Sequence, residues 1–206
     1  MPGSNTKRTN RVWSRVCQLW QANEGAQIAE LAVSLPLLAL LFVATYDVGQ
    51  AFNVKQKLVA ATREAARFAA NQSTSDLTNS ASGNCNAPAS ICAVRDLIHS
   101  YLLAADLNDC GLASTNAKAT TTWQFEFDAS SSSCGTGNKF IVIINRQFTY
   151  STTSTSSGGN VTVTVEATQV TMSYPYQWQF NRMIQILGTN LAVSPIPTSA
   201  VMQNMN

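Results

Sequence analysis

One long apolar run dominates the pattern of hydrophobic and polar positions along the chain. Sixteen residues, from Leu31 to Tyr46, carry no formal charge. As a helix this run is about 24 Å long, so it crosses a bilayer only if flanking residues contribute. Pro36 lies inside the run and removes one backbone hydrogen bond, so we expect a kink or local melting there.

The helical pattern continues beyond the apolar run. Apolar positions recur at spacings of three and four as far as Phe68, which predicts one helix over residues 26–70, about 65 Å long. The positions of this stripe are Val48, Ala51, Val54, Leu58, Ala61, Ala65 and Phe68. Two interpretations of its second half stay open: a stalk lying on its own domain, or a seam for another subunit.

Beyond residue 70 the pattern predicts a small domain that contains both helices and strands. A Ser/Asn/Gly-rich loop over residues 71–90 precedes a second helix with one apolar face. That face consists of Val94, Leu97, Ile98, Tyr101, Leu102 and Ala105. A short third helix is expected from Phe180 to Leu187, ending at Gly188, and an extended tail through Pro195 and Pro197.

Between these helices the apolar period changes to two, which predicts strands. Trp123, Phe125 and Phe127 alternate with polar residues, and the unbroken apolar run at 140–144 predicts a central strand covered on both faces. A third alternating strand contains Val161, Val163 and Val165. The opposite parity that begins at Val170 indicates a bulge near Thr168. Ser/Thr/Gly-rich segments at 129–138 and 151–160 are predicted to be hairpin loops.

These elements predict the fold class. It is α+β: a long N-terminal transmembrane and stalk helix, then a small domain with an antiparallel sheet of three or four strands and one or two packed helices.

Charge predicts the orientation of the anchor. Only 12% of the residues are charged, about half the usual share. Before the apolar run, Glu24 opposes four basic residues: Lys7, Arg8, Arg11 and Arg15. Short basic flanks stay in the cytoplasm, so we expect a single-pass membrane protein with its N-terminus inside and its C-terminus outside. Residues 1–25 would form a basic cytoplasmic leader, 26–70 the transmembrane and stalk helix, and 71–206 an extracytoplasmic domain.

The cysteines fit this orientation. Cys17 lies alone on the predicted cytoplasmic side, and four cysteines lie on the other side: Cys85, Cys92, Cys110 and Cys134. An even number in an oxidising space predicts two disulfides. Of three possible connectivities we favour 85–92 with 110–134, which closes the shortest non-crossing loops. A zinc site is the weaker alternative, because no Cys-x-x-Cys pair is present.

The sequence contains no recognisable catalytic constellation, and we expect no enzyme activity, cofactor or metal. The sequence has no Gly-rich phosphate-binding loop, no nucleophile-elbow pattern and no helix with metal-binding histidines. The single histidine, His99, has no evident partner, and Asp106 and Asp109 are interpreted as solvated helix ends. The basic residues after position 70 are scattered, which argues against nucleic acid as a partner.

Glu30 is the exception, because a carboxylate at the start of a membrane segment is costly and needs a partner. Gly25 lies five residues upstream of it. Cutting the chain after Gly25 would free the amine of Ala26, one helical turn from Glu30 or able to reach a neighbouring subunit. The amine would then neutralise the carboxylate and set the axial register of neighbouring helices.

Two segments resemble one family. The stretch 25–38, Gly-Ala-Gln-Ile-Ala-Glu followed by Leu-Ala-Val-Ser-Leu-Pro-Leu-Leu, is similar to the start of TadE-like pseudopilins, minor pilins of the tight-adherence (Tad/Flp) pilus. The stretch 56–67, Gln-Lys-Leu-Val-Ala-Ala-Thr-Arg-Glu-Ala-Ala-Arg, resembles the segment after the membrane helix in that family. The resemblance covers about residues 25–70, and both parts occur in the right order.

The resemblance implies a pilus assembly role. A prepilin peptidase would cut between Gly25 and Ala26, and Glu30 would be the assembly carboxylate. Partners would be the inner membrane, that peptidase, other pseudopilins or the major pilin, and the Tad assembly machinery, with possible incorporation in a thin adhesive pilus. In one departure from the pilin pattern, Leu31 stands where an aromatic residue often follows the glutamate.

Two alternatives remain from the sequence. One is an uncleaved single-pass membrane protein whose periplasmic domain binds a ligand or partner. The other is a secreted protein with an unusual signal peptide, which would need a small-x-small cleavage site after the apolar core; residues 42–46 supply a poor one.

Overall fold

The computed structural model describes residues 23–78, 84–135, 138–156, 159–181 and 193–204. These residues form two helices of three turns or more, two short 3-10 turns and five strands. The chain divides into two compact units, Met1–Val48 and Gly49–Asn206, and each is described by itself. The predicted division into leader, helix and outer domain remains a prediction.

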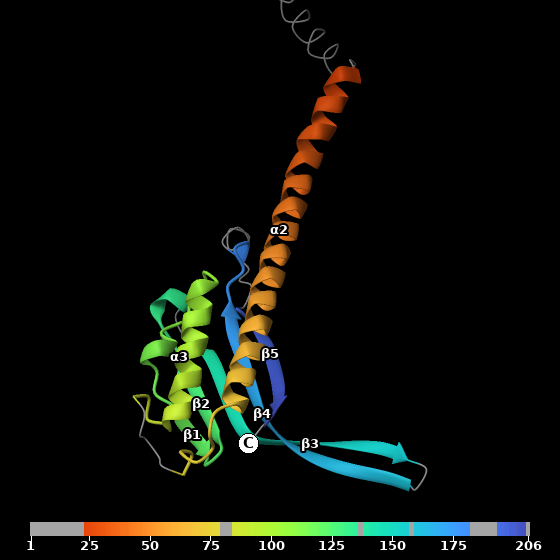
Figure 1. Cartoon of the computed structure of the whole chain (residues 1–206). Helices are drawn as coiled ribbons and strands as arrows, with labels where there is room; N and C mark the ends of the chain where they lie inside the picture. The colour runs from red at the N-terminus through yellow and green to blue at the C-terminus, as the bar shows by residue number, and fades with distance from the viewer. Residues whose placement is uncertain (1–22, 79–83, 136–137, 157–158, 182–192, 205–206) are drawn as a thin grey trace, which may run out of the picture. The chain divides into compact units, whose positions relative to one another are not determined.

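The first helix, α2, extends over Asn23–Ala70 and contains Pro36 (Figure 1). A kink or local melting was expected at Pro36; the helix is continuous there, so it does not melt. Within Gln27–Ala70 an 18-residue window reaches a mean hydropathy of 2.2 with none of its residues buried. By length and composition α2 can cross a membrane, and a membrane anchor fits this segment of the chain.

The strands form one antiparallel meander in the order β1-β2-β3-β4-β5 (Figure 1). The bounds are Lys118–Thr121, Gln124–Ala129, Phe140–Ser156, Gly159–Tyr176 and Ser194–Gln203. Every strand pairs with its neighbour in sequence, so the sheet needs no crossover connection. The α+β class is therefore confirmed, with five strands where the sequence predicted three or four.

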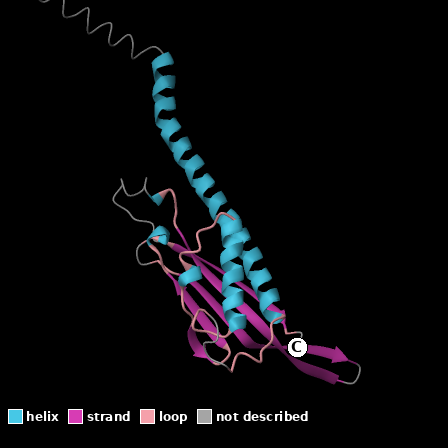
Figure 2. Cartoon of the chain, turned by 60° about the vertical axis from the view of Figure 1, so that its left-hand side comes forward, coloured by secondary structure: helices cyan, strands magenta, loops and turns pink. Residues whose placement is uncertain are grey.

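Both helices of the second unit pack on one face of this sheet (Figure 2). Helix α3, Ala89–Ala104, contributes Ile91, Val94, Ile98 and Leu102 to the core. The part of α2 after Gly49 contributes Leu58, Ala61 and Ala65. The sheet supplies Phe125, Phe127, Phe140, Val142, Ile144, Val170 and Met172. The second half of the α2 stripe is thus a stalk that lies on its own domain.

The opposite face of the sheet is only half-covered. Phe140–Ile144 does lie in the central strand, but Ile141 and Ile143 on the second face are intermediate in exposure. The expectation that both faces of this strand are covered was therefore wrong. An unbroken apolar run indicates burial, but it does not reveal how complete the burial of each face is.

The predicted bulge is present at the level of Thr168, but on the partner strand. Asn145 pairs with Gln169 and Phe148 with Ala167, so Arg146 and Gln147 of β3 lie opposite Thr168 alone. The apolar parity of β4 changes at this point. Before it, Val161 and Val163 are exposed; after it, Val170, Met172 and Tyr174 are buried.

The segment 151–160 was predicted to be a loop, and this was wrong. β3 and β4 continue as a paired hairpin, with Ser156 opposite Gly159. We call residues 149–156 and 159–166 the hairpin arm. Ser and Thr are often read as loop residues, but here they alternate with valine across the strands and form hydroxyl pairs, Ser151 with Thr164 and Thr153 with Thr162.

Two further differences concern the ends of the domain. The extended tail forms the edge strand β5, and Pro195 and Pro197 lie within it, which is where a sheet tolerates proline. The predicted third helix falls mainly on residues 182–188, outside the described residues; Phe180 at its start lies in a turn.

Candidate functional site

The sequence-predicted processing and assembly residues all lie near the beginning of α2. Gly25 and Ala26 belong to its first helical turns, and Glu30 follows one turn later, exposed. Glu30 lies in a shallow groove on the helix surface with Ala29, Val33 and Leu37. Ser34 also lines this groove and is the one polar side chain among these neighbours, but its hydroxyl donates to the Leu31 carbonyl. The surroundings of the carboxylate on the helix itself are therefore mostly apolar.

The surface beyond Glu30 is apolar and unburied. Leu31, Val33, Leu35, Leu37, Leu38, Leu40, Leu41 and Phe42 are all exposed large hydrophobic residues. Polar side chains in this stretch satisfy themselves within the helix: Ser34 donates to the Leu31 carbonyl and Thr45 to that of Leu41. Such a surface suits lipid, where backbone and hydroxyl groups must find partners internally.

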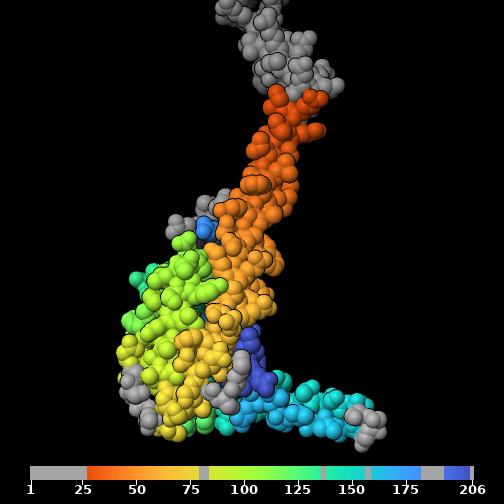
Figure 3. Space-filling model, viewed as in Figure 1, coloured from red at the N-terminus to blue at the C-terminus, as the bar shows by residue number. Residues whose placement is uncertain are grey.

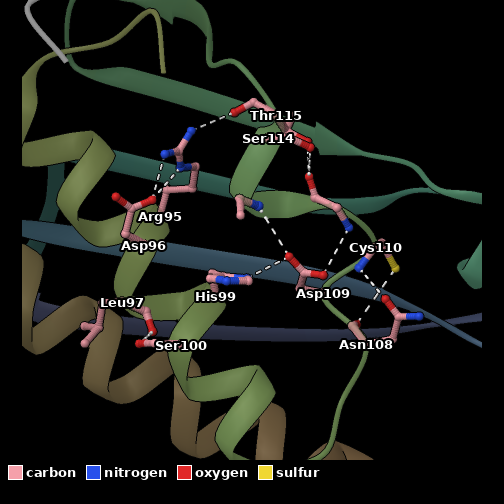
Figure 4. Close-up of polar contacts among 12 residues, drawn as sticks. Arg95, Asp96, Leu97, His99, Ser100, Asn108, Asp109, Cys110, Ser114 and Thr115 are labelled. Carbon is pink, nitrogen blue, oxygen red and sulfur yellow. Dashed lines mark hydrogen bonds and ion pairs between the residues drawn. The ribbon is translucent and has the colours of Figure 1, made fainter. Parts of the chain in front are cut away.

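A second polar constellation, which the sequence did not predict, lies in the second unit (Figure 4). His99 on α3 places its Nδ1 2.8 Å from Oδ2 of Asp109. Asp109 also accepts backbone N–H bonds from Gly111 at 3.2 Å and Ala113 at 3.3 Å. Asp109 was interpreted as a solvated helix end; it is instead largely buried and closes the turn that carries Cys110.

The electrostatics of Asp109 reflect two opposed causes. Burial raises the pKa of this carboxyl, whereas the hydrogen bonds from Gly111, His99 and Ala113 lower it, with the net result below the usual value. Nearby Tyr174 behaves in the opposite way, because burial raises the pKa of its phenol despite a hydrogen bond from the Asn108 backbone. Within the described part of the chain, His99 has no side-chain hydrogen bond to a serine or cysteine, so the pair serves to hold the turn.

Two buried arginines hold other loops against the sheet and helix. Arg95 on α3 donates to Asp96, to the Asn84 side chain and to the Thr115 carbonyl. Arg146, at the bulge of β3, donates from Nη2 to the Gln72 carbonyl at 2.7 Å. Burial lowers the pKa of Arg146, while the nearby charge of Asp76 raises it.

The four cysteines of the second unit form two disulfides, Cys85–Cys92 and Cys110–Cys134. These are the short non-crossing loops that the sequence favoured. The first bridge joins the loop after α2 to the first turn of α3, and the second joins the Asp109 turn to the β2–β3 connection. Across the described ranges, no group of three or more His, Cys, Asp or Glu side chains is placed to hold a metal ion.

Comparison with known proteins gives a match for the α2 segment that contains Gly25, Ala26 and Glu30. A family model described as TadE-like protein matches residues 25–67. This segment is similar to TadE-like proteins. The match begins at Gly25 and covers most of α2, and it extends over about a fifth of the chain. No curated protein and no solved structure matches the chain.

The TadE-like segment and the outer polar contacts differ in how far the sequence could predict them. Gly25, Ala26 and Glu30 follow one another along a single helix, so spacing alone brings them together. His99 and Asp109 lie ten residues apart across a helix end and a turn. A signal was present in Asp109 itself, because an aspartate two residues before a glycine is suited to accept backbone N–H bonds in a local turn.

Proposed function

We propose that this protein is a minor pilin that a prepilin peptidase processes after Gly25 and that takes part in assembling a Tad-type adhesive pilus. The observation that carries this proposal is the start of the TadE-like match at Gly25, followed by continuous matching as far as residue 67. The apolar, unburied helix surface after Glu30 supports the same reading.

Processing would change the electrostatics at the start of the helix. Hydrolysis of the Gly25–Ala26 peptide bond consumes one water and leaves a carboxylate on Gly25 and an amine on Ala26. Ala26 and Glu30 are four residues apart on α2, a spacing that brings side chains to about 5–6 Å between Cβ atoms. The new amine, on the same or an adjacent chain, would neutralise Glu30 and so reduce the cost of placing it in lipid.

This proposal also gives each remaining part of the chain a place relative to the membrane. The basic leader, residues 1–25, would remain in the cytoplasm, the helix would cross the inner membrane, and the disulfide-bonded domain would lie outside. The helix would thereby supply the contacts within a filament, while the domain faces its periphery.

Cleavage is tested by mass spectrometry of the mature N-terminus. In cells with a prepilin peptidase we expect the chain to begin at Ala26; in cells without it, at Met1. A chain that begins at Met1 in both would favour the uncleaved membrane protein with a periplasmic binding domain. Release of the outer domain into the medium would favour the secreted protein.

The role of Glu30 is tested by Glu30→Ala. We expect unchanged membrane insertion and unchanged cleavage, but reduced pilus assembly, because the Ala26 amine would lack its partner. Thr45→Ala, which changes an exposed polar residue of the same helix outside the Glu30 groove, is the matched control. Normal assembly by Glu30→Ala would contradict the role assigned to the carboxylate.

A further inference from the structure

The hairpin arm leaves two sheet edges unpaired. β2 pairs with β3 only as far as Asn145, and β5 pairs with β4 only from Ala167 onward. Beyond these points, the described residues of the arm form two strands with no third strand beside them, and the arm stands out from the rest of its unit (Figure 3). A two-stranded hairpin is marginal by itself in water, whereas three or more strands with an apolar face are stable.

The arm also has one apolar face. Tyr150 pairs with Val165, Thr152 with Val163 and Ser154 with Val161, so these side chains share a face. Tyr150 is 41% exposed, Val163 48% and Val161 56%. The opposite face carries the Ser and Thr hydroxyl pairs and is suited to water.

The outer edges of the main sheet are protected, but those of the arm are not. β5 contains Pro195 and Pro197, and β1 is four residues long with Lys118 and a register shift. Prolines, charges, bulges and short edge strands are the usual means of preventing edge-to-edge pairing. Apart from Glu166 and the bulge at its base, the arm lacks them: the 17 residues from Thr149 to Val165 include no proline and no charge.

We propose that the arm pairs with the arm of a second copy of this chain, through the outer edge of β3 at residues 147–156. The β3 edge is favoured because on the β4 side the chain after β5 already reaches the arm, where Asn204 donates to the Glu166 carbonyl. Two identical strands that pair in antiparallel fashion are related by a two-fold axis, so each copy gives and receives the same hydrogen bonds and the assembly closes as a dimer.

The chemistry of the arm selects this partner over lipid. The unpaired edge requires backbone donors and acceptors, which acyl chains lack, and each unsatisfied group costs several kcal/mol in lipid. A second arm supplies those groups, and because the paired edge at residues 147–156 carries no charge, the two copies meet without like-charge repulsion. The two-fold axis is perpendicular to the sheet, so both Tyr150–valine faces join into one four-stranded apolar face.

The test uses the full chain in its membrane, with Cys17→Ser to remove the fifth cysteine. Thr153→Cys places a thiol on the polar face of the arm; Thr120→Cys, an exposed threonine on edge strand β1, is the matched control. A thiol cross-linker of about 10 Å spans two strand spacings. We expect a cross-linked homodimer for Thr153→Cys and background only for Thr120→Cys.

Charge reversal then tests edge pairing directly. With Ser151→Cys as the reporter, Thr153→Lys should lower the dimer yield roughly two- to fivefold, because residue 153 lies near the middle of the paired 147–156 edge and its lysine comes close to the same lysine of the second copy. Mixing Thr153→Lys with Thr153→Glu chains should restore the yield. A yield that is unaffected by Thr153→Lys, equal yields for the arm and β1 thiols, cross-links only to a different protein, or protection of the arm thiol from alkylation by lipid vesicles without a second copy would each overturn the proposal. Variants are compared only after peptide mapping shows both native disulfides.

Discussion

Thr62 of α2 and Thr198 of β5 share a buried hydroxyl–hydroxyl hydrogen bond of 2.8 Å. The two residues are 136 positions apart in sequence, and Thr62 also donates to the Leu58 carbonyl at 2.6 Å. One of them belongs to the TadE-like segment and the other to the last strand. The contact therefore joins the stalk part of α2 to the far edge of the sheet within the second unit.

Thr62→Val is expected to lower the free energy of unfolding by about 1–3 kcal/mol, because the buried Thr198 hydroxyl loses its partner. Thr62→Val together with Thr198→Val should cost less than the sum of the single changes, since the double variant leaves no hydroxyl unpaired. Urea unfolding of the four proteins measures this coupling. Thr120→Val, at an exposed position of β1, should change the free energy little; strict additivity at 62 and 198 would contradict the contact.

Asp109 is expected to make stability depend on pH in the acid range. Its pKa is lowered in the folded state, so its contribution is fully present above the unfolded value of 3.8 and is lost as pH falls through the folded pKa. The difference in unfolding free energy between the native protein and Asp109→Asn should therefore be about 1 kcal/mol at neutral pH and shrink in acid. Unfolding curves measured from pH 7 to pH 2.5 check this prediction.

The variant His99→Gln separates the contribution of the imidazole to the pKa of Asp109 from the contribution of the backbone N–H bonds. The hydrogen bonds from Gly111 and Ala113 remain in this variant, so the pKa of Asp109 should rise towards its usual value without reaching that of a fully desolvated group. NMR titration of the Asp109 carboxyl gives the change directly. An unchanged pKa in His99→Gln would mean that the 2.8 Å contact contributes nothing.

The parts of the fold that the sequence predicted well are those fixed by local periodicity. The spacing of Leu58, Ala61 and Ala65 indicates one helix face, and the alternation of Phe125 and Phe127 indicates one strand face. Both patterns depend on neighbours within two turns or a few residues. For the same reason the position of Gly25 relative to Glu30 could be interpreted without a structure.

The parts that were missed depend on partners distant in sequence. Ser151 and Thr153 suggest a loop when considered alone, and only their pairing with Thr164 and Thr162 makes them a strand. The exposure of Ile143 depends on what covers the second face of the sheet. His99 and Asp109 meet because the chain turns back after α3. None of these is a property of a local window.

The two disulfides are expected to stabilise the second unit to different extents. Cys110–Cys134 closes a longer loop, with a separation of 24 residues against 7 for Cys85–Cys92. On the chain-entropy model these loops correspond to about 3.5 and 2.5 kcal/mol. Urea unfolding of the paired Cys→Ser variants should therefore show the larger loss for positions 110 and 134. The reverse order would show that strain or residual structure outweighs loop length.

Arg146 provides the last prediction, because it combines complete burial with incomplete hydrogen bonding. The residue is 1% exposed, and among the described residues its Nε and Nη1 have no hydrogen-bond partner. Arg146→Met would remove this desolvated charge and keep most of the volume, so the free energy of unfolding should stay within about 1 kcal/mol of the native protein or increase. Arg146→Ala would leave a cavity and should cost about 2–4 kcal/mol. If Arg146→Met is as destabilising as Arg146→Ala in urea unfolding, then the bond to the Gln72 carbonyl and the attraction to Asp76, rather than packing, account for the residue's contribution.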